Sequence, residues 1–385
     1  MELQIREHRP AHPRQKKAPM RAWPTREAPL SDRRDGRAPV SSSHLPQRRP
    51  WARRGLSLAR WPPTQAATTS AAFACSPMNT SYEYTHAEPP SFLSKLCVLG
   101  FRLSGIKRQS ADKAREAIDK DSLPAPIPAR MLAKFDVVQR EFEGRPVWTL
   151  SPKGGRSDKV VLYLHGGAYI ANIIRPHWSL IECLIDQTQA SVMVPDYPLA
   201  SAATCLDVFT YLDRLMPDFH RFRANRPWTI MGDSAGGGLS YAWSQWLRNH
   251  GQPQANRIIL LSPWLDISTT NPKQLEIDRH DPMLPLMPVR MAAKAYVGDV
   301  PYDDYRVSPL FGDLQNLPPV SVFTGTYDIV NADAHELKDR LKSEHIPYNF
   351  YEYPKMFHVF MALTFLKEAK VAIGQISDLI RGARD

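Results

Sequence analysis

The sequence predicts an α/β fold, in which a mostly parallel sheet is flanked by helices. Two observations support this prediction. From about residue 147 onward, short apolar runs alternate with helical stretches, and that alternation is typical of parallel sheets with helices on both faces. Some of these runs, such as residues 160–164 and 258–261, are apolar at every position, as strands buried on both faces are.

The elements follow in order along the chain. Strand-like runs cover residues 147–150, 159–164, 191–195, 228–231, 257–261, 320–324 and 348–353. Helical periodicity covers residues 91–106, 111–119, 176–188, 203–216, 234–249, 331–344 and 361–381. Pro124, Pro126 and Pro128 predict a linker after the first two helices.

The net charge of +10 is confined to the start of the chain. Residues 1–70 hold 15 basic and 5 acidic residues, whereas the other 315 hold 34 of each sign. This leader is also rich in proline and cannot bury enough apolar surface to offset its ordering entropy. We therefore expect a disordered basic leader over residues 1–90 and a charge-neutral domain over 91–385. A neutral domain argues against nucleic-acid binding.

The same region bears on localisation. No secretory signal is expected, because the first 30 residues lack an apolar core. The arginines and serines of the leader allow a transit peptide, whereas its prolines and Glu2, Glu7 and Asp32 argue against one, and translation from Met78 is a further alternative. No apolar run is long enough to span a membrane. The four cysteines have the spacing of neither a zinc site nor a disulfide framework, so we expect a cytoplasmic protein with free thiols.

Residues 232–236 read Gly-Asp-Ser-Ala-Gly and lie between a predicted strand and a predicted helix. This is the strand–turn–helix setting in which a G-x-S-x-G turn exposes a nucleophilic serine. Gly232 and Gly236 are small enough for that turn, and the helix after it directs its N-terminal amides toward the site. We therefore predict Ser234 as a nucleophile, flanked by Asp233 and Ala235.

A second glycine segment, residues 165–169 (His-Gly-Gly-Ala-Tyr), follows the predicted strand at 159–164. Acyl transfer needs N–H donors that stabilise the oxyanion of its tetrahedral intermediate, and glycines let a backbone approach a substrate closely. The segment is therefore a candidate oxyanion hole.

A serine nucleophile also needs a base and an acid that orients the base. Of the five histidines after Ser234, His358 lies in the loop after the last predicted strand, which is where this chain order places the base. Asp328 follows the preceding strand directly and is the predicted acid. Asp333 lies further on, where it would stabilise the start of a helix.

Taken together, these segments resemble the hormone-sensitive-lipase-like branch of the α/β-hydrolases, which contains microbial and fungal short-chain esterases. The resemblance covers about residues 91–382. It also rests on residues 196–200 (Asp-Tyr-Pro-Leu-Ala), 262–266 (Ser-Pro-Trp-Leu-Asp), 308–310 (Ser-Pro-Leu) and 317–319 (Leu-Pro-Pro). The family usually has a third glycine where this chain has Ala168.

The resemblance implies an eight-stranded α/β-hydrolase sheet with a helical cap built from residues 91–125 and 270–297. It implies Ser234, Asp328 and His358 as the catalytic triad. Backbone donors would come from Gly166, Gly167 and Ala235, while His165, Ala168, Gly232, Asp233 and Gly236 would shape the motifs. The apolar helix at 91–106 would roof the pocket.

The predicted function is that of a serine esterase. It would remove a short acyl group, acetyl foremost, from a small to medium-sized alcohol such as a secondary metabolite or sterol, through an acyl-enzyme and without a metal or organic cofactor. Three alternatives stay open: an amidase or deacetylase, a deformylase, and a non-catalytic small-molecule receptor. The sequence also allows a homodimer.

Overall fold

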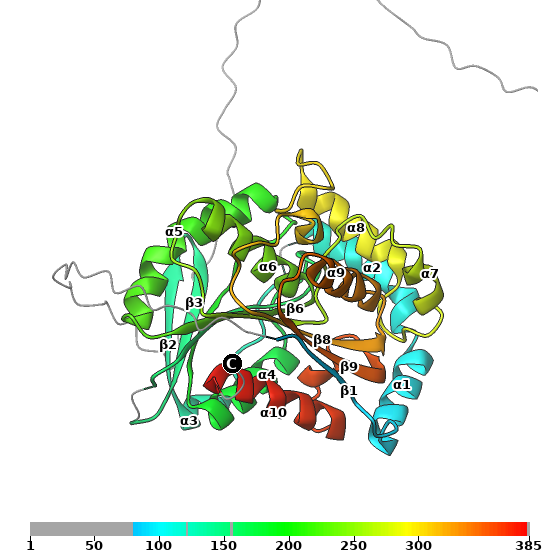
Figure 1. Cartoon of the computed structure of the whole chain (residues 1–385), viewed down its shortest axis with the longest axis horizontal. Coiled ribbons are helices and arrows are strands. Elements are labelled where there is room, and N and C mark those ends of the chain that lie inside the picture. Colours follow the sequence, from blue (N-terminus) through cyan, green and yellow to red (C-terminus); the bar gives the residue numbers. More distant parts are fainter. Residues whose placement is uncertain (1–79, 121, 155–156, 383–385) are drawn as a thin grey trace, which may run out of the picture. The chain divides into compact units, whose positions relative to one another are not determined.

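The computed structural model describes residues 80–120, 122–154 and 157–382. Most of the leader, residues 1–79, lies outside these ranges, so its predicted disorder is not addressed. The described elements alternate as predicted (Figure 1). The strands are β1 (Tyr82–Thr85), β2 (Phe135–Phe142), β3 (Arg145–Pro152), β4 (Val160–Leu164), β5 (Ser191–Pro195), β6 (Trp228–Asp233), β7 (Arg257–Leu261), β8 (Val320–Tyr327) and β9 (Tyr348–Phe357).

The helices are α1 (Phe92–Ser104), α2 (Ile106–Asp119), α3 (Ala129–Lys134), α4 (Arg175–Thr188), α5 (Cys205–Arg223), α6 (Ser234–Asn249), α7 (Lys273–Ile277), α8 (Leu286–Val297), α9 (Asn331–Ser343) and α10 (Lys367–Arg381). Two 3₁₀ turns, η1 (Pro309–Phe311) and η2 (Phe360–Ala362), complete the described elements.

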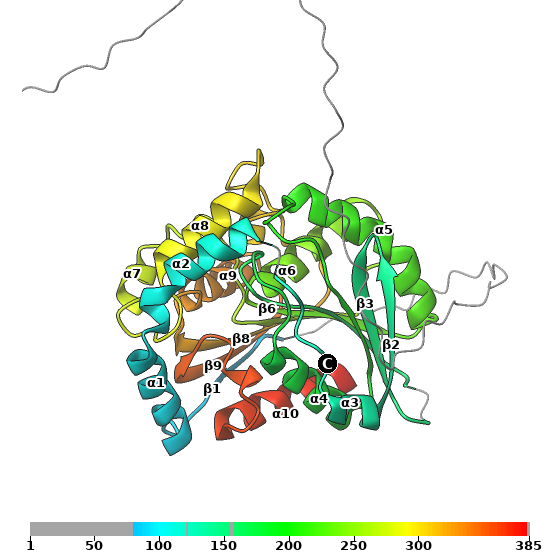
Figure 2. The ribbon, with the colours of Figure 1, turned by 180° about the vertical axis from the view of Figure 1, so that it is seen from behind.

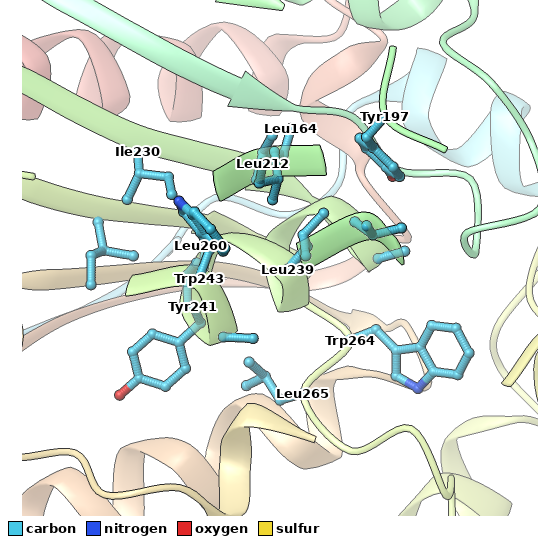
Figure 3. Close-up of a cluster of buried hydrophobic side chains, with 14 of the residues drawn as sticks. Leu164, Tyr197, Leu212, Ile230, Leu239, Tyr241, Trp243, Leu260, Trp264 and Leu265 are labelled. Atoms are coloured by element: carbon cyan, nitrogen blue, oxygen red, sulfur yellow. The ribbon is translucent and has the colours of Figure 1, made fainter. Parts of the chain in front are cut away.

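The strands form one sheet in the order β1-β9-β8-β7-β6-β4-β5-β3-β2. The pairs from β1 to β5 along this order are parallel, and β3 runs antiparallel to both β5 and β2. Two hydrophobic cores cover its two faces, because neighbouring residues of the central strands point to opposite sides. Leu164, Ile230 and Leu260 pack with Leu212 of α5 and Leu239 of α6 (Figure 3). Residues of α8 and α9 belong to the same core, whereas Tyr163, Met231 and Ile259 pack with α4 and α10 on the other face.

The described sheet has nine strands where eight were expected. The apolar runs that predicted strands did not include β1 and β2, which are the two edge strands of the sheet. β1 falls within the predicted leader, yet it pairs in parallel with β9, and Tyr82 and Tyr84 lie against Tyr351 and Tyr353. The folded domain therefore begins before residue 91. This aromatic pairing offsets the ordering cost of a four-residue edge strand.

β2 and β3 form a hairpin whose two-residue turn consists of Glu143 and Gly144, both at positive φ (49° and 76°). Two positive φ values define the type I′ turn, whose twist matches that of paired strands. β2 escaped the periodicity analysis because it is only partly buried at the edge of the sheet and carries charged residues.

Candidate active site

Ser234 lies at the junction of β6 and α6 with a φ of 52°, in the left-handed region that a serine rarely adopts. Gly232 and Gly236 make this turn possible. A Cβ on Gly232 would lie 2.2 Å from the carbonyl oxygen of Gly236, and one on Gly236 would lie 2.0 Å from that of Leu164. Any larger side chain would therefore displace the backbone, and strain of this kind persists only where the surrounding structure enforces it.

Asp328 and His358 form a buried hydrogen-bonded pair. Asp328 follows β8 and His358 follows β9, and Nδ1 of the histidine lies 3.0 Å from each carboxylate oxygen. Burial alone would lower the pKa of His358, but the charge and hydrogen bond of Asp328 outweigh it and raise that pKa. The bond fixes Nδ1 as the protonated nitrogen, which leaves Nε2 able to accept a proton.

Ser234 and His358 are brought to one edge of the sheet by its topology. β6, β7, β8 and β9 are consecutive and parallel, so the loops after them meet at the same edge. The loop after β7 bridges two of them: the amide of Trp264 donates to the carbonyl of Ser234 (2.9 Å), and the Ser262 hydroxyl accepts from the amide of Val359 (3.1 Å). Within the described residues no hydrogen bond joins Ser234 to His358; such bonds often tighten only when substrate binds.

The amide of Gly166, one of the predicted oxyanion donors, already has an acceptor in the structure. It donates to Oδ1 of Asp233 at 3.0 Å and is therefore occupied. Within the described ranges, the amides of Gly167, Ala168 and Ala235 donate to no acceptor. Gly167 has a φ of 121°, and a Cβ there would lie 2.2 Å from the carbonyl oxygen of Ala171. Ala168, which was expected to act only in shaping the motif, replaces Gly166 as a candidate donor.

The carboxylate of Asp233 joins the serine turn to the glycine segment. It accepts hydrogen bonds from the Tyr163 hydroxyl (2.6 Å), the amide of Gly166 (3.0 Å) and Nε2 of His177 (3.1 Å). Burial would raise the pKa of Asp233, but His177 and the other donors outweigh it and hold that pKa at about 2. Tyr163 lies in β4 just before the glycine segment and His177 lies in α4 after it, but neither residue belongs to a motif, so the motifs could not indicate them.

The contacts of His165 are those of a residue that supports the structure of the glycine segment. It is fully buried, its ring stacks on Tyr197 at 4.5 Å, and its Nδ1 lies 2.7 Å from the carbonyl oxygen of Gly166. The Tyr197 hydroxyl in turn donates to the carbonyl of His165 (2.5 Å). Burial lowers the pKa of His165 to about 4, so the ring is neutral at physiological pH.

A further carboxylate, Asp281, lies behind the Asp328–His358 pair and was not indicated by any motif. It accepts from the amides of Met283 (2.8 Å), Leu284 (2.9 Å) and Ile329 (3.0 Å), the last being the residue after Asp328. Burial and the neighbouring charge of Asp328 raise the pKa of Asp281 to about 6. Its charge also contributes to raising the pKa of His358.

The helices α2 and α8 lie side by side in both ribbon views (Figures 1 and 2). Ala114 of α2 and Ala292 of α8 form a small apolar cluster with Ile170, and Ala168 packs against it. These two helices therefore contact the candidate oxyanion segment.

Two further features concern ligands and membranes. In the described ranges no group of three or more His, Cys, Asp or Glu side chains is placed to hold a metal ion. Cys97, Cys183 and Cys205 are free thiols, and Cys75 lies outside the described residues. Among the helices that the structure describes, none combines the length and apolar character needed to cross a bilayer.

Comparison with known proteins agrees with this architecture. A model of the alpha/beta hydrolase fold family matches residues 161–362. An esterase of Acinetobacter venetianus is 29% identical over 57% of this chain and 74% of its own length. An acetyl-hydrolase of Streptomyces hygroscopicus is 30% identical over 52% of this chain and 68% of its own length. The crystal structure of an esterase from the bacterial hormone-sensitive lipase family covers 77% of this chain and all of its own, with 25% identity and a TM-score of 0.64.

The fold and the comparisons define the class as an α/β-hydrolase, and within it the chain belongs to the hormone-sensitive-lipase-like family. It is a serine hydrolase that acts on carboxylesters.

Proposed function

We propose that this hydrolase cleaves esters of short acyl groups, acetyl foremost, through an acyl-enzyme on Ser234. One observation supports this most. Ser234, in a strained turn between β6 and α6, and the buried Asp328–His358 pair lie at the same edge of the sheet. The named acetyl-hydrolase among the relatives favours an acetyl substrate.

In this mechanism His358 accepts the proton of Ser234 at Nε2 while Oγ forms a bond to the ester carbonyl carbon. The carbonyl oxygen becomes an oxyanion, which the free amides of Gly167, Ala168 and Ala235 stabilise. The imidazolium then gives its proton to the departing alcohol as the ester C–O bond breaks. Water, deprotonated by His358, attacks the acyl-enzyme and releases the acid, so the serine regains its proton.

We further propose that α2 and α8 act as the predicted cap. Ala114 and Ala292 hold Ile170 and Ala168 in place beside the amide donors. A cap that packs this closely on the oxyanion segment limits the room beside it and favours short acyl chains.

The nucleophile is tested with p-nitrophenyl acetate and the purified full chain. We expect Ser234→Ala to lower kcat by at least about 10⁴-fold, because without the nucleophile no acyl-enzyme forms. Ser244→Ala is the matched control, since Ser244 lies on the same helix and donates only along it, to the carbonyl of Ser240 (2.8 Å). Equal turnover by Ser234→Ala and the wild type would refute the assignment.

Acyl preference and bond type need separate measurements. A series of p-nitrophenyl esters from acetate to octanoate should show kcat/KM falling with chain length. A p-nitroanilide of the same acyl group, compared with the ester, decides between esterase and amidase activity. Faster turnover of octanoate would contradict the proposed role of the cap, and faster turnover of the anilide would contradict a preference for esters over amides.

A further inference from the structure

Helix α1 exposes a row of large apolar side chains. Phe92, Leu96, Leu99 and Leu103 are 77, 51, 52 and 74% exposed. Their spacing of four, three and four residues places all four on one face of the helix. Such a row was expected to roof the substrate pocket, but it points away from the protein. Both ribbon views show α1 at the outer edge of the described domain (Figures 1 and 2).

The opposite face of α1 is fixed to the domain. Glu368 of α10 accepts hydrogen bonds from the Ser91 amide (2.5 Å), the Ser91 hydroxyl (3.0 Å) and the Ser94 hydroxyl (2.7 Å). Phe101 packs edge-on against Phe357, with ring centroids 5.2 Å apart. Because the inner face already has these partners, the outward apolar row is a stable feature of the fold.

The segment of chain that contains α1 carries charge of a single sign, and of its cations Lys107, at the start of α2, is paired with Asp278 (2.9 Å). From residue 89 to residue 111 the chain has no acidic residue and four basic ones: Lys95, Arg102, Lys107 and Arg108. Lys95 and Arg102 are exposed along one flank of the row. The 79 residues before the described domain add 15 basic and 5 acidic residues. An apolar stripe edged by cations is the pattern of a helix that lies in the interface of an anionic membrane.

We propose that α1 docks this hydrolase on an anionic lipid bilayer, with its apolar row inserted among the acyl chains and its basic residues at the headgroups. A second copy of the chain fits this surface less well, because it would bring the same cations face to face. A short apolar helix alone binds a membrane weakly, and a polybasic segment supplies the second interaction that stable binding needs.

Docking through α1 would bring the active site to the membrane surface. Phe101 contacts Phe357, which immediately precedes His358. The neighbouring residue, Arg102, donates to the carbonyl of His280 (3.3 Å), whose ring stacks on Tyr327, the residue before Asp328. If the proposed esterase function holds, the substrate class is therefore an ester that partitions into bilayers, an amphiphile with a short acyl group.

Vesicle flotation of the full chain tests docking independently of catalysis. We expect binding to vesicles of phosphatidylcholine with phosphatidylserine, and much weaker binding to phosphatidylcholine alone, falling as salt rises. Leu96→Ser/Leu99→Ser should lower the partition coefficient by about tenfold or more, because two inserted side chains are lost. The matched control is Leu206→Ser/Phe311→Ser, which removes two exposed apolar side chains outside α1.

Several results would overturn the proposal: no binding to the anionic vesicles, equal binding by both double variants, or a dimer in analytical ultracentrifugation that Leu96→Ser/Leu99→Ser dissociates without any change in vesicle binding. Thermal unfolding midpoints show whether the variants are folded. Ser234→Ala should still float with anionic vesicles, so a failure of docking and a failure of the esterase assignment are distinguishable.

Discussion

The carboxylate of Asp233, which precedes Ser234, connects the serine turn to the glycine segment by accepting a hydrogen bond from Gly166. The substitution Asp233→Asn tests how much this carboxylate contributes to the stability of the fold. In the folded state its pKa is about 2, against an ordinary 3.8. Each pH unit of such a difference corresponds to about 1.4 kcal/mol, so the ionised carboxylate contributes about 2 kcal/mol at neutral pH. Because the folded pKa is the lower one, this contribution is complete well above pH 3.8 and is lost as the pH falls through about 2.

Asparagine cannot reproduce the pattern of bonds. The Ile174 amide donates to Nδ1 of His177 (3.0 Å), so Nε2 must carry the proton that Asp233 accepts. If the asparagine turns its amide nitrogen toward Nε2 of His177, two donors face each other. If it turns its amide oxygen there, its amide nitrogen faces the Tyr163 hydroxyl and the Gly166 amide, both of which donate to Asp233 in the wild type. A buried group left without its partner costs about 1–3 kcal/mol. Added to the contribution of the charge, this gives an expected loss of about 3–5 kcal/mol for Asp233→Asn.

The assay is urea unfolding at a series of pH values. The difference in unfolding free energy between wild type and Asp233→Asn should be largest near neutral pH, and its charge-dependent part should fall to about 1 kcal/mol near pH 3. Asp136→Asn, at an exposed position on β2, is the control and should change stability by less than about 0.5 kcal/mol. The kcat of Asp233→Asn should also fall by about 10–100-fold, because Gly166 no longer holds the oxyanion segment. A variant as stable as wild type at neutral pH would refute this reasoning.

Three further predictions concern the same region. In Asp281→Asn, one of the negative charges that raise the pKa of His358 is absent, so that pKa should fall. Because the base must be neutral to act, the acid limb of the plot of kcat/KM against pH should move to lower pH, and an unmoved limb would contradict this. In Gly166→Ala, a Cβ would lie 2.2 Å from Oδ2 of Asp233, so urea unfolding should show a loss of about 2–4 kcal/mol, and a stability within error of wild type would exclude the clash. In Glu368→Ala, the start of α1 loses its three bonds, so amide hydrogen exchange should speed up in α1 and stay unchanged in α8.

Much of the fold could be predicted because the central strands have a clear sequence signal, a continuous run of mostly apolar residues. β5 and β7 were predicted with the bounds that the structure has, since a strand buried on both faces is apolar at nearly every position. The edge strands lack that signal: β1 has four residues and β2 alternates apolar with charged ones. α5 runs past its predicted end at residue 216 because Phe219 and Phe222 pack into the core beyond Pro217. The aromatic pairs and packing that fix these elements are long-range and invisible to a local pattern.

In the candidate site, too, local sequence signals could be recognised and long-range contacts could not. Local motifs indicated Ser234, and chain order indicated Asp328 and His358, which the structure joins by a hydrogen bond; their catalytic roles stay predictions. The motif could not show which glycine amide is free. That depends on the Asp233 carboxylate, 67 residues further along the chain, which binds the amide of Gly166. The alignment of two loops from neighbouring strands thus occupies the amide of Gly166, and we propose the amide of Ala168 as a donor in its place.

The basic leader and the apolar helix gain a common explanation when they are considered together. The surplus of ten positive charges suggested an anionic partner, and the neutral domain argued against nucleic acid. The exposed row on α1 restricts the choice further, since only a partner with both anionic and apolar parts satisfies both features. A nucleic acid offers charge without an accessible apolar interior, whereas an anionic lipid leaflet offers charged headgroups directly above apolar acyl chains. For an esterase this placement has a direct benefit, because an ester dissolved in the bilayer reaches the enzyme by lateral diffusion and does not first have to enter water.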